Sequence, residues 1–140
     1  MTAGETTALT RALRAFFAVP PPGTAAVYLF GSVARGDAER RSDVDVAVLF
    51  DNDPPRTLDN LHAALGERLQ EAIGRPVDLI VLNHAPADLV HRVLRDGILI
   101  NEENRAARIA FEVRSRNEYF DLAPIRERYR RSPATGSTAR

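Results

Sequence analysis

Two aspartates separated by a single residue offer the clearest chemistry in this sequence. Asp43 and Asp45 stand at the start of an alternating apolar segment, Val44–Phe50. Side chains alternate between the two faces of a strand, so both carboxylates point the same way, with Cα atoms about 6.5–7 Å apart. At that separation both can reach one divalent cation, or a pair of cations about 3.5–4 Å apart. Because the two charges would otherwise repel at neutral pH, the pair requires a cation or an arginine nearby.

A glycine–serine turn that precedes this segment offers the complementary chemistry, the binding of an anion. Gly31 closes the apolar segment Val27–Phe30, and a glycine there permits a sharp turn and a close backbone approach to a ligand. Ser32 is a favourable N-cap for a short helix, Val33–Gly36. Free N–H groups at the start of that helix, the serine hydroxyl and the Arg35 guanidinium suit phosphate groups. Together, the turn and the aspartates describe a site for a nucleotide and Mg²⁺.

A third aspartate, Asp78, is the only charged residue of the apolar segment Val77–Leu82. A carboxylate inside a buried strand is unfavourable unless it is paired or bound to a metal. Taken alone, Asp78 is best explained by a buried arginine partner. With Asp43 and Asp45 on a neighbouring strand, a metal site becomes the better interpretation.

The order and spacing of these residues resemble the active-site signature of the DNA polymerase β-like nucleotidyltransferase superfamily. Gly31-Ser32 is followed, after ten residues, by Asp43-Val44-Asp45, and a later strand carries the third aspartate. The fuller string GSVARGDAERRSDVDVAV resembles the minimal nucleotidyltransferase (MNT) antitoxins of HEPN/MNT toxin–antitoxin pairs. The segment FEVRSRNEYFDLAPIRERY resembles their C-terminal helix, so the likeness covers nearly the whole chain. A Gly-Ser or an Asp-x-Asp motif alone would be weak evidence for this superfamily. Both motifs at this spacing, each next to a predicted strand, are specific evidence for it.

This resemblance implies nucleotidyl transfer with ATP as co-substrate and two Mg²⁺ ions. Asp43 and Asp45 would ligate both ions, while Asp78 would complete the catalytic one and could accept the proton of the attacking hydroxyl. Gly31 and Ser32 would hold the β- and γ-phosphates.

Three arginines near this site have two interpretations each. Arg35 either contacts phosphate or forms an ion pair with a neighbouring acid, and the sequence favours neither. Arg40 and Arg41 precede the aspartates and are better explained as solvated loop residues than as triphosphate contacts.

The partner implied by the resemblance is a HEPN toxin, a ribonuclease whose tyrosine would receive AMP and which would thereby be inactivated. Two alternatives stay open: a nucleotidyltransferase acting on a small molecule or RNA, and a non-catalytic antitoxin that neutralises its toxin by binding. Arginines and aromatic residues in the segment 102–131 suit a protein interface, although a solvated helix face is an equal explanation.

Composition places the chain among ordinary globular proteins. Its 140 residues are 44% hydrophobic and 27% charged, which predicts a single domain over residues 1–131 and a disordered tail over 132–140. The formal net charge of zero argues against an extended nucleic-acid footprint. There is no cysteine, no membrane-length apolar run and no signal-peptide pattern, so we expect a cytoplasmic protein.

Apolar periodicity predicts strands and helices in alternation and a long helix near the C-terminus. The resemblance implies that they form an α/β (α+β) fold, a small mixed sheet flanked by helices, of the polymerase β-like nucleotidyltransferase type. The predicted strands are Val27–Phe30, Val44–Phe50, Val77–Leu82 and Ile98–Ile100. The predicted helices are Thr7–Val19, Val33–Gly36, Leu58–Ile73, Pro86–Arg95, Glu102–Asp121 and Ile125–Tyr129. In the helix from Glu102, the predicted buried stripe is Ala106, Ile109, Ala110, Val113 and Phe120. His62, His84 and His91 have no ligand-like spacing and are expected to be surface or core residues.

Overall fold

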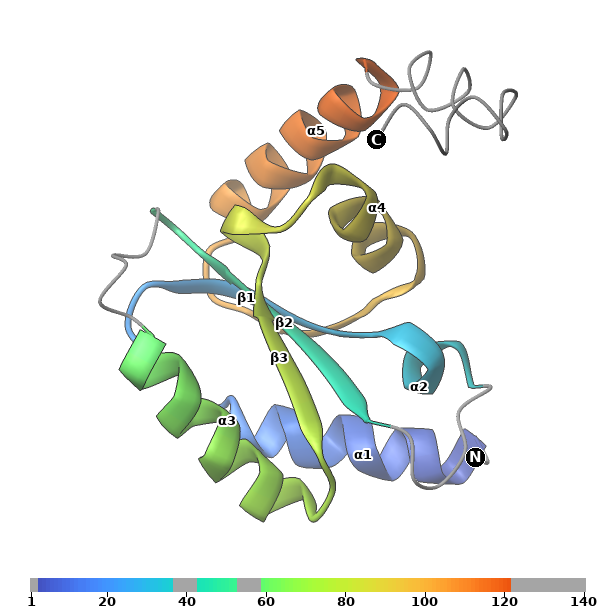
Figure 1. The fold of residues 1–140 in the computed structure, drawn as a ribbon, viewed down its shortest axis with the longest axis vertical. Coiled ribbons are helices and arrows are strands. Elements are labelled where there is room, and N and C mark those ends of the chain that lie inside the picture. Colours follow the sequence, from blue (N-terminus) through green and yellow to red (C-terminus); the bar gives the residue numbers. More distant parts are fainter. Residues whose placement is uncertain (1–2, 37–42, 53–58, 122–140) are drawn as a thin grey trace, which may run out of the picture.

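The computed structural model describes residues 3–36, 43–52 and 59–121, and Figure 1 shows their arrangement. In chain order the elements are α1 Ala3–Phe16, β1 Thr24–Phe30, α2 Gly31–Arg35, β2 Val44–Phe50, α3 Asp59–Ile73, β3 Val77–Val81, the 3₁₀ turn η2 Leu82–His84, α4 Ala87–Asp96, β4 Ile98–Glu102 and α5 Arg105–Asp121. The predicted helix Ile125–Tyr129 and the predicted tail 132–140 lie outside the described residues.

The four strands form one mixed sheet in the order β3-β2-β1-β4. β1 is antiparallel to both β2 and β4, whereas β2 and β3 run parallel, with α3 as their crossover. A parallel pair needs such a crossover, because a tight turn can join only antiparallel strands. The predicted class, a small mixed sheet flanked by helices, is confirmed.

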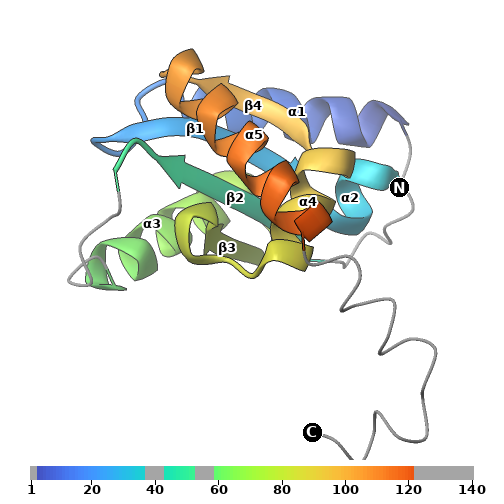
Figure 2. The same cartoon turned by 90° about the horizontal axis from the view of Figure 1, so that it is seen from above.

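Helices cover both faces of this sheet (Figure 1). On one face, α1 and α3 supply Leu13 and Leu69 to a core that includes the β2 valines. On the other face, α4 and α5 supply Val93 and Phe111 to a second core, and Figure 2 shows α5 passing over the sheet beside α4. The sheet therefore lies between two helical layers, each with its own core.

Strand β2 divides its side chains between the two layers, as its alternating pattern predicts. Val46 and Val48 belong to the core under α1 and α3, while Ala47 and Leu49 belong to the core under α4 and α5. Because faces alternate along a strand, Asp45 shares the face of Ala47 and Leu49. The aspartate therefore lies on the α4 side of the sheet.

The predicted buried stripe of α5 is wrong. Ile109, Val113 and Phe120 are 42%, 49% and 60% exposed, and Ala106 and Ala110 are exposed with them. The helix instead buries the opposite face, on which Phe111 and Ala107 pack against the sheet.

Polar contacts explain why α5 turns this way. The Tyr28 hydroxyl of β1 donates to Glu112 Oε2 (2.9 Å), and Arg108 bridges Glu112 and Glu102. On the same side of the helix, the Tyr119 ring stacks on His91 of α4 at 3.7 Å. Periodicity selects the more apolar face of a helix, and here that face points to solvent.

Some predicted boundaries also shift. The first helix begins at Ala3 and ends at Phe16, and the first strand begins at Thr24, because a short turn follows Pro21. The long helix begins at Arg105 rather than Glu102, since Glu102 is the last residue of β4. None of the described helices combines the length and apolar character needed to cross a membrane.

Candidate functional site

The glycine–serine turn joins β1 directly to α2. Gly31 has φ +76°, a backbone conformation that side-chain-bearing residues rarely adopt, and it is the first residue of α2. The prediction that Ser32 caps the helix is wrong: Phe30 is the N-cap residue, in an extended conformation, and no side chain caps the helix. Ser32 lies inside the first turn, where backbone N–H groups have no intrahelical acceptor. The turn therefore presents both N–H donors and a hydroxyl.

Asp45 lies directly against this turn. It is the antiparallel partner of Phe30, the residue that precedes Gly31. A Cβ placed on Gly31 would be 2.1 Å from Asp45 Oδ2, far inside van der Waals contact. Only glycine leaves room for this carboxylate, so the structure brings the predicted phosphate turn and a predicted metal ligand together.

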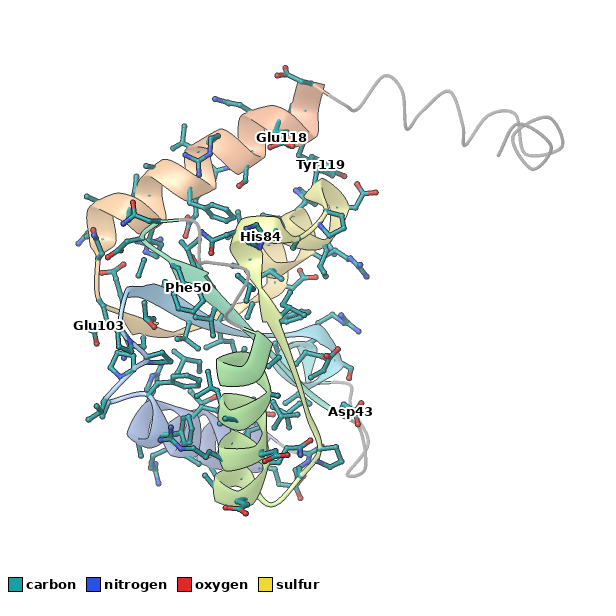
Figure 3. All side chains as sticks on the ribbon, turned by 60° about the vertical axis from the view of Figure 1, so that its left-hand side comes forward. Asp43, Phe50, His84, Glu103, Glu118 and Tyr119 are labelled. Carbon is teal, nitrogen blue, oxygen red and sulfur yellow. The ribbon has the colours of Figure 1, made fainter. Side chains whose placement is uncertain are left out.

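Asp78 is the register partner of Asp45 on the parallel strand β3. Neighbouring strands lie about 4.7–4.9 Å apart, and register partners point to the same face. Asp43 is exposed and immediately precedes β2, and Figure 3 labels it at that end of the sheet. All three predicted acids therefore lie at one corner of the sheet. Within the described residues, however, no three His, Cys, Asp or Glu side chains converge as ligands of one ion.

The charges at this corner favour a cation. Partial burial raises the pKa of Asp45, and the neighbouring carboxylates of Asp78 and Asp43 raise it further, while Arg35 opposes them. Carboxylate oxygens are hard ligands of the kind that Mg²⁺ prefers, and Arg35 only partly offsets the mutual repulsion of these three acids. The donor chemistry of these acids therefore fits the predicted magnesium site.

A pocket of about 310 Å³ opens beside the turn. One side of it is formed by the predicted residues Gly31, Ser32, Arg35 and Asp45. The remaining lining residues are Phe30 at the end of β1 and Leu89, Arg92 and Asp96 of α4. Asp43 and Asp78 do not line the pocket and lie at the adjoining corner of the sheet.

The α4 residues of this pocket were not anticipated from the sequence. No sequence motif marks Leu89, Arg92 and Asp96 as pocket residues. Their sequence indicates only that they share one face of the helix after the Asp78 strand, at positions i, i+3 and i+7. His91 lies on another face of α4, where it stacks on Tyr119. Arg40, Arg41 and the His62 side chain lie outside the described residues.

Comparison with known proteins shows the family of this chain. The family model described as "Polymerase beta, Nucleotidyltransferase" matches residues 20–106, more than half of the chain. The chain belongs to this family. The matched segment contains the turn, all three acids and the α4 wall, so every part of the pocket lies within the nucleotidyltransferase domain.

A curated relative of this nucleotidyltransferase is the protein adenylyltransferase MntA of Shewanella oneidensis. The two are 39% identical over 72 residues, which is 51% of this chain and 49% of the relative. The chain thus matches about half the length of that relative.

Solved structures extend the likeness to most of the chain. A toxin–antitoxin structure with AMP-PNP has a TM-score of 0.71 and 25% identity, covering 84% of this chain and 92% of its own. A tri-AMPylated HEPN toxin of Shewanella oneidensis in complex with its MNT antitoxin has a TM-score of 0.67 and 22% identity, covering 87% and 92%. The fold of this nucleotidyltransferase is therefore the fold found in those complexes.

Proposed function

We propose that this chain is a cytoplasmic antitoxin, a Mg²⁺-dependent protein adenylyltransferase that transfers AMP from ATP to a tyrosine of a HEPN toxin. The observation that carries the proposal is the contact between Gly31 and Asp45, which brings the glycine–serine turn and one carboxylate of the acidic corner into one pocket. The MntA relative is named a protein adenylyltransferase, and the similar complexes contain AMP-PNP or an AMPylated HEPN toxin. Those names support the choice of co-substrate and acceptor.

The residues of the turn would bind the triphosphate. Backbone N–H groups of the first turn of α2 and the Ser32 hydroxyl would donate to β- and γ-phosphate oxygens. Gly31 lets that backbone approach the nucleotide closely. Arg35, which borders the pocket, would offset negative charge that develops on the phosphates during transfer.

The acids would hold the metal. Asp45 and Asp78 are adjacent in the sheet, and Asp43 lies two residues before Asp45, so these three would supply the carboxylate oxygens for Mg²⁺. When bound, Mg²⁺ lowers the pKa of the attacking hydroxyl and neutralises the leaving pyrophosphate. Asp78 would also be placed to accept the proton of the tyrosine hydroxyl as its oxygen attacks the α-phosphate.

Transfer of this kind would inactivate a ribonuclease in a simple way. A phosphodiester-linked adenosine adds bulk and a negative charge at the place where an RNA phosphate must dock. The antitoxin would then act catalytically, since one molecule could modify many toxin molecules.

The solvent face of α5 is the surface that we assign to the toxin. Ile109, Val113 and Phe120 form an exposed apolar stripe, and exposed large apolar side chains grouped in this way are typical of interaction sites. The same stripe would serve a non-catalytic antitoxin, which is therefore the second candidate function.

Intact mass spectrometry separates the two candidates. The wild-type chain, ATP and Mg²⁺ are incubated with a HEPN protein from the same genome, beside the double variant Asp43→Asn/Asp45→Asn. An AMP-sized gain that maps to a tyrosine and disappears with the variant supports the adenylyltransferase. Neutralisation without any gain, undiminished in the variant, would instead establish an antitoxin that acts by binding. Asp51→Asn, in the exposed bend after β2, is the matched control for losing one carboxylate.

A further inference from the structure

The pocket beside the glycine–serine turn has a second wall that the family signature does not include. Leu89, Arg92 and Asp96 of α4 form it, and Arg92 is the only cationic side chain among these three. Building on the proposed function, we propose that Arg92 is a nucleotide-binding residue that contacts the polyphosphate of ATP from the α4 wall. Arg35 would serve the same phosphates from α2.

Arg92 is held in place by rigid elements. The Gly97 N–H donates to the Val93 carbonyl oxygen (2.8 Å), and a Cβ on Gly97 would be 2.3 Å from that oxygen and 3.4 Å from the Leu29 carbonyl oxygen. Ile98 then pairs with Leu29 in the sheet. The end of α4 is thereby fixed against β1, two residues before Gly31. Arg92 lies one helical turn before Asp96, so both face the same pocket.

The charge of Arg92 is available to a ligand. Among the described residues it forms no hydrogen bond or ion pair. Of the two acids four positions away on α4, Asp96 accepts two hydrogen bonds from Arg95, at 2.9 and 2.8 Å, and Asp88 has an interaction of its own. Arg35, by contrast, already interacts with another group and also faces Asp45. An arginine that borders a pocket without a protein partner is suited to an anionic ligand.

The pocket also needs this charge. The carbonyl end of a helix carries partial negative charge, and α4 ends at Asp96 beside the pocket. Asp45 adds a carboxylate on the other side. A triphosphate that enters this space would be repelled unless cationic side chains offset both. Arg92 is exposed and borders the same pocket as Gly31 and Ser32, the residues that would hold the β- and γ-phosphates.

The test measures nucleotide affinity with the full chain alone, in Mg²⁺, by isothermal titration with ATP, ADP and AMP. Arg92→Ala should weaken ATP binding roughly 10- to 100-fold, the scale of one charge-assisted hydrogen-bond pair, while AMP affinity changes less than about twofold. Arg92→Lys should restore part of the loss. The matched control, Arg11→Ala, removes the same charge from the exposed face of α1, across the sheet, and should change nothing.

Other outcomes would overturn the assignment. An equal loss of affinity for ATP and AMP would mean that Arg92 contacts the nucleoside or that it only stabilises the fold. Unchanged ATP affinity, with a raised KM for the acceptor protein, would make Arg92 a contact for that protein. These results differ from a failure of the proposed function, in which the wild-type chain binds ATP and transfers no AMP to any HEPN protein.

Discussion

Asp45 Oδ2 lies so close to Gly31 that no larger residue fits at the start of α2. Gly31 also has a positive φ of +76°, so the position requires glycine for two independent reasons. One is the backbone conformation and the other is the space that the carboxylate occupies. The glycine–serine turn and one acid of the acidic corner therefore meet in a single contact.

Gly31→Ala should abolish AMP transfer. A side chain there must displace Asp45 and must also adopt a left-handed conformation, which costs about 1–2 kcal/mol by itself. Gly74→Ala is the matched control, because Gly74 has a similar φ of +75° and nothing within 4 Å of an added Cβ. Urea unfolding should show a larger loss of stability for Gly31→Ala than for Gly74→Ala. Normal transfer by Gly31→Ala would contradict the importance of the contact.

Asp45→Asn should separate activity from stability. Partial burial, and then the like charges of Asp78 and Asp43, disfavour the ionised Asp45 carboxylate. A neutral amide of the same shape should therefore leave the free energy of unfolding unchanged or slightly higher. Transfer should fall by at least about 100-fold, the scale of losing one charge-stabilising group in an active site. Parallel urea unfolding and transfer assays check both parts. A clearly destabilised Asp45→Asn protein would show that the ionised carboxylate has a structural partner.

Much of this site was predictable because strands and short motifs are local. Alternation along β2 was enough to place Asp45 on one face, and the apolar run around Asp78 was enough to place a second acid in a strand. The α4 wall was not predictable, since Arg92 faces the pocket only through the packing of α4 against the end of β1. The prediction that Ser32 is the N-cap was wrong because α2 begins at Gly31, two residues before the start at Val33 that a Ser32 cap implies.

In helix α5 the apolar periodicity was correct, but the face that it selected as buried is exposed. Its apolar stripe with Ile109 and Val113 is the stronger of two, yet the structure buries the weaker one with Phe111. Glu112 holds the buried face of α5 in place, because it accepts hydrogen bonds from Tyr28 and Arg108. Tyr28 lies more than eighty positions before Glu112 in the sequence. Long-range polar pairs of this kind leave no periodic signal in the sequence.

Tyr28→Phe should lower the free energy of unfolding by about 1 kcal/mol, because Glu112 loses a hydrogen-bond donor at a part-buried contact. Burial, and then Glu112, raise the pKa of Tyr28 well above its ordinary value near 10. The unfolded chain therefore releases this proton at a lower pH than the folded one, and the contribution of Tyr28 is lost as the pH rises above about 10. Urea titrations of both proteins at pH 8 and pH 10.5 check this. If the difference in free energy of unfolding between the wild-type and Tyr28→Phe proteins grew with pH, this prediction would be contradicted.

The exposed stripe of α5 should be needed for the toxin and not for the nucleotide. Val113→Asp places a charge in the middle of the stripe, so binding of the HEPN protein should weaken by at least about tenfold, as expected for an apolar interface contact. Affinity for ATP should be unchanged, since the pocket proposed for the nucleotide is lined by residues of β1, α2, β2 and α4 rather than α5. Val19→Asp makes the same change at an 86% exposed valine in the turn after α1 and serves as the control. Biolayer interferometry with the HEPN protein and circular dichroism of each variant supply the measurement and the check on folding. If Val113→Asp binds the toxin as tightly as Val19→Asp does, the toxin docks elsewhere, and the stripe must be assigned to another contact.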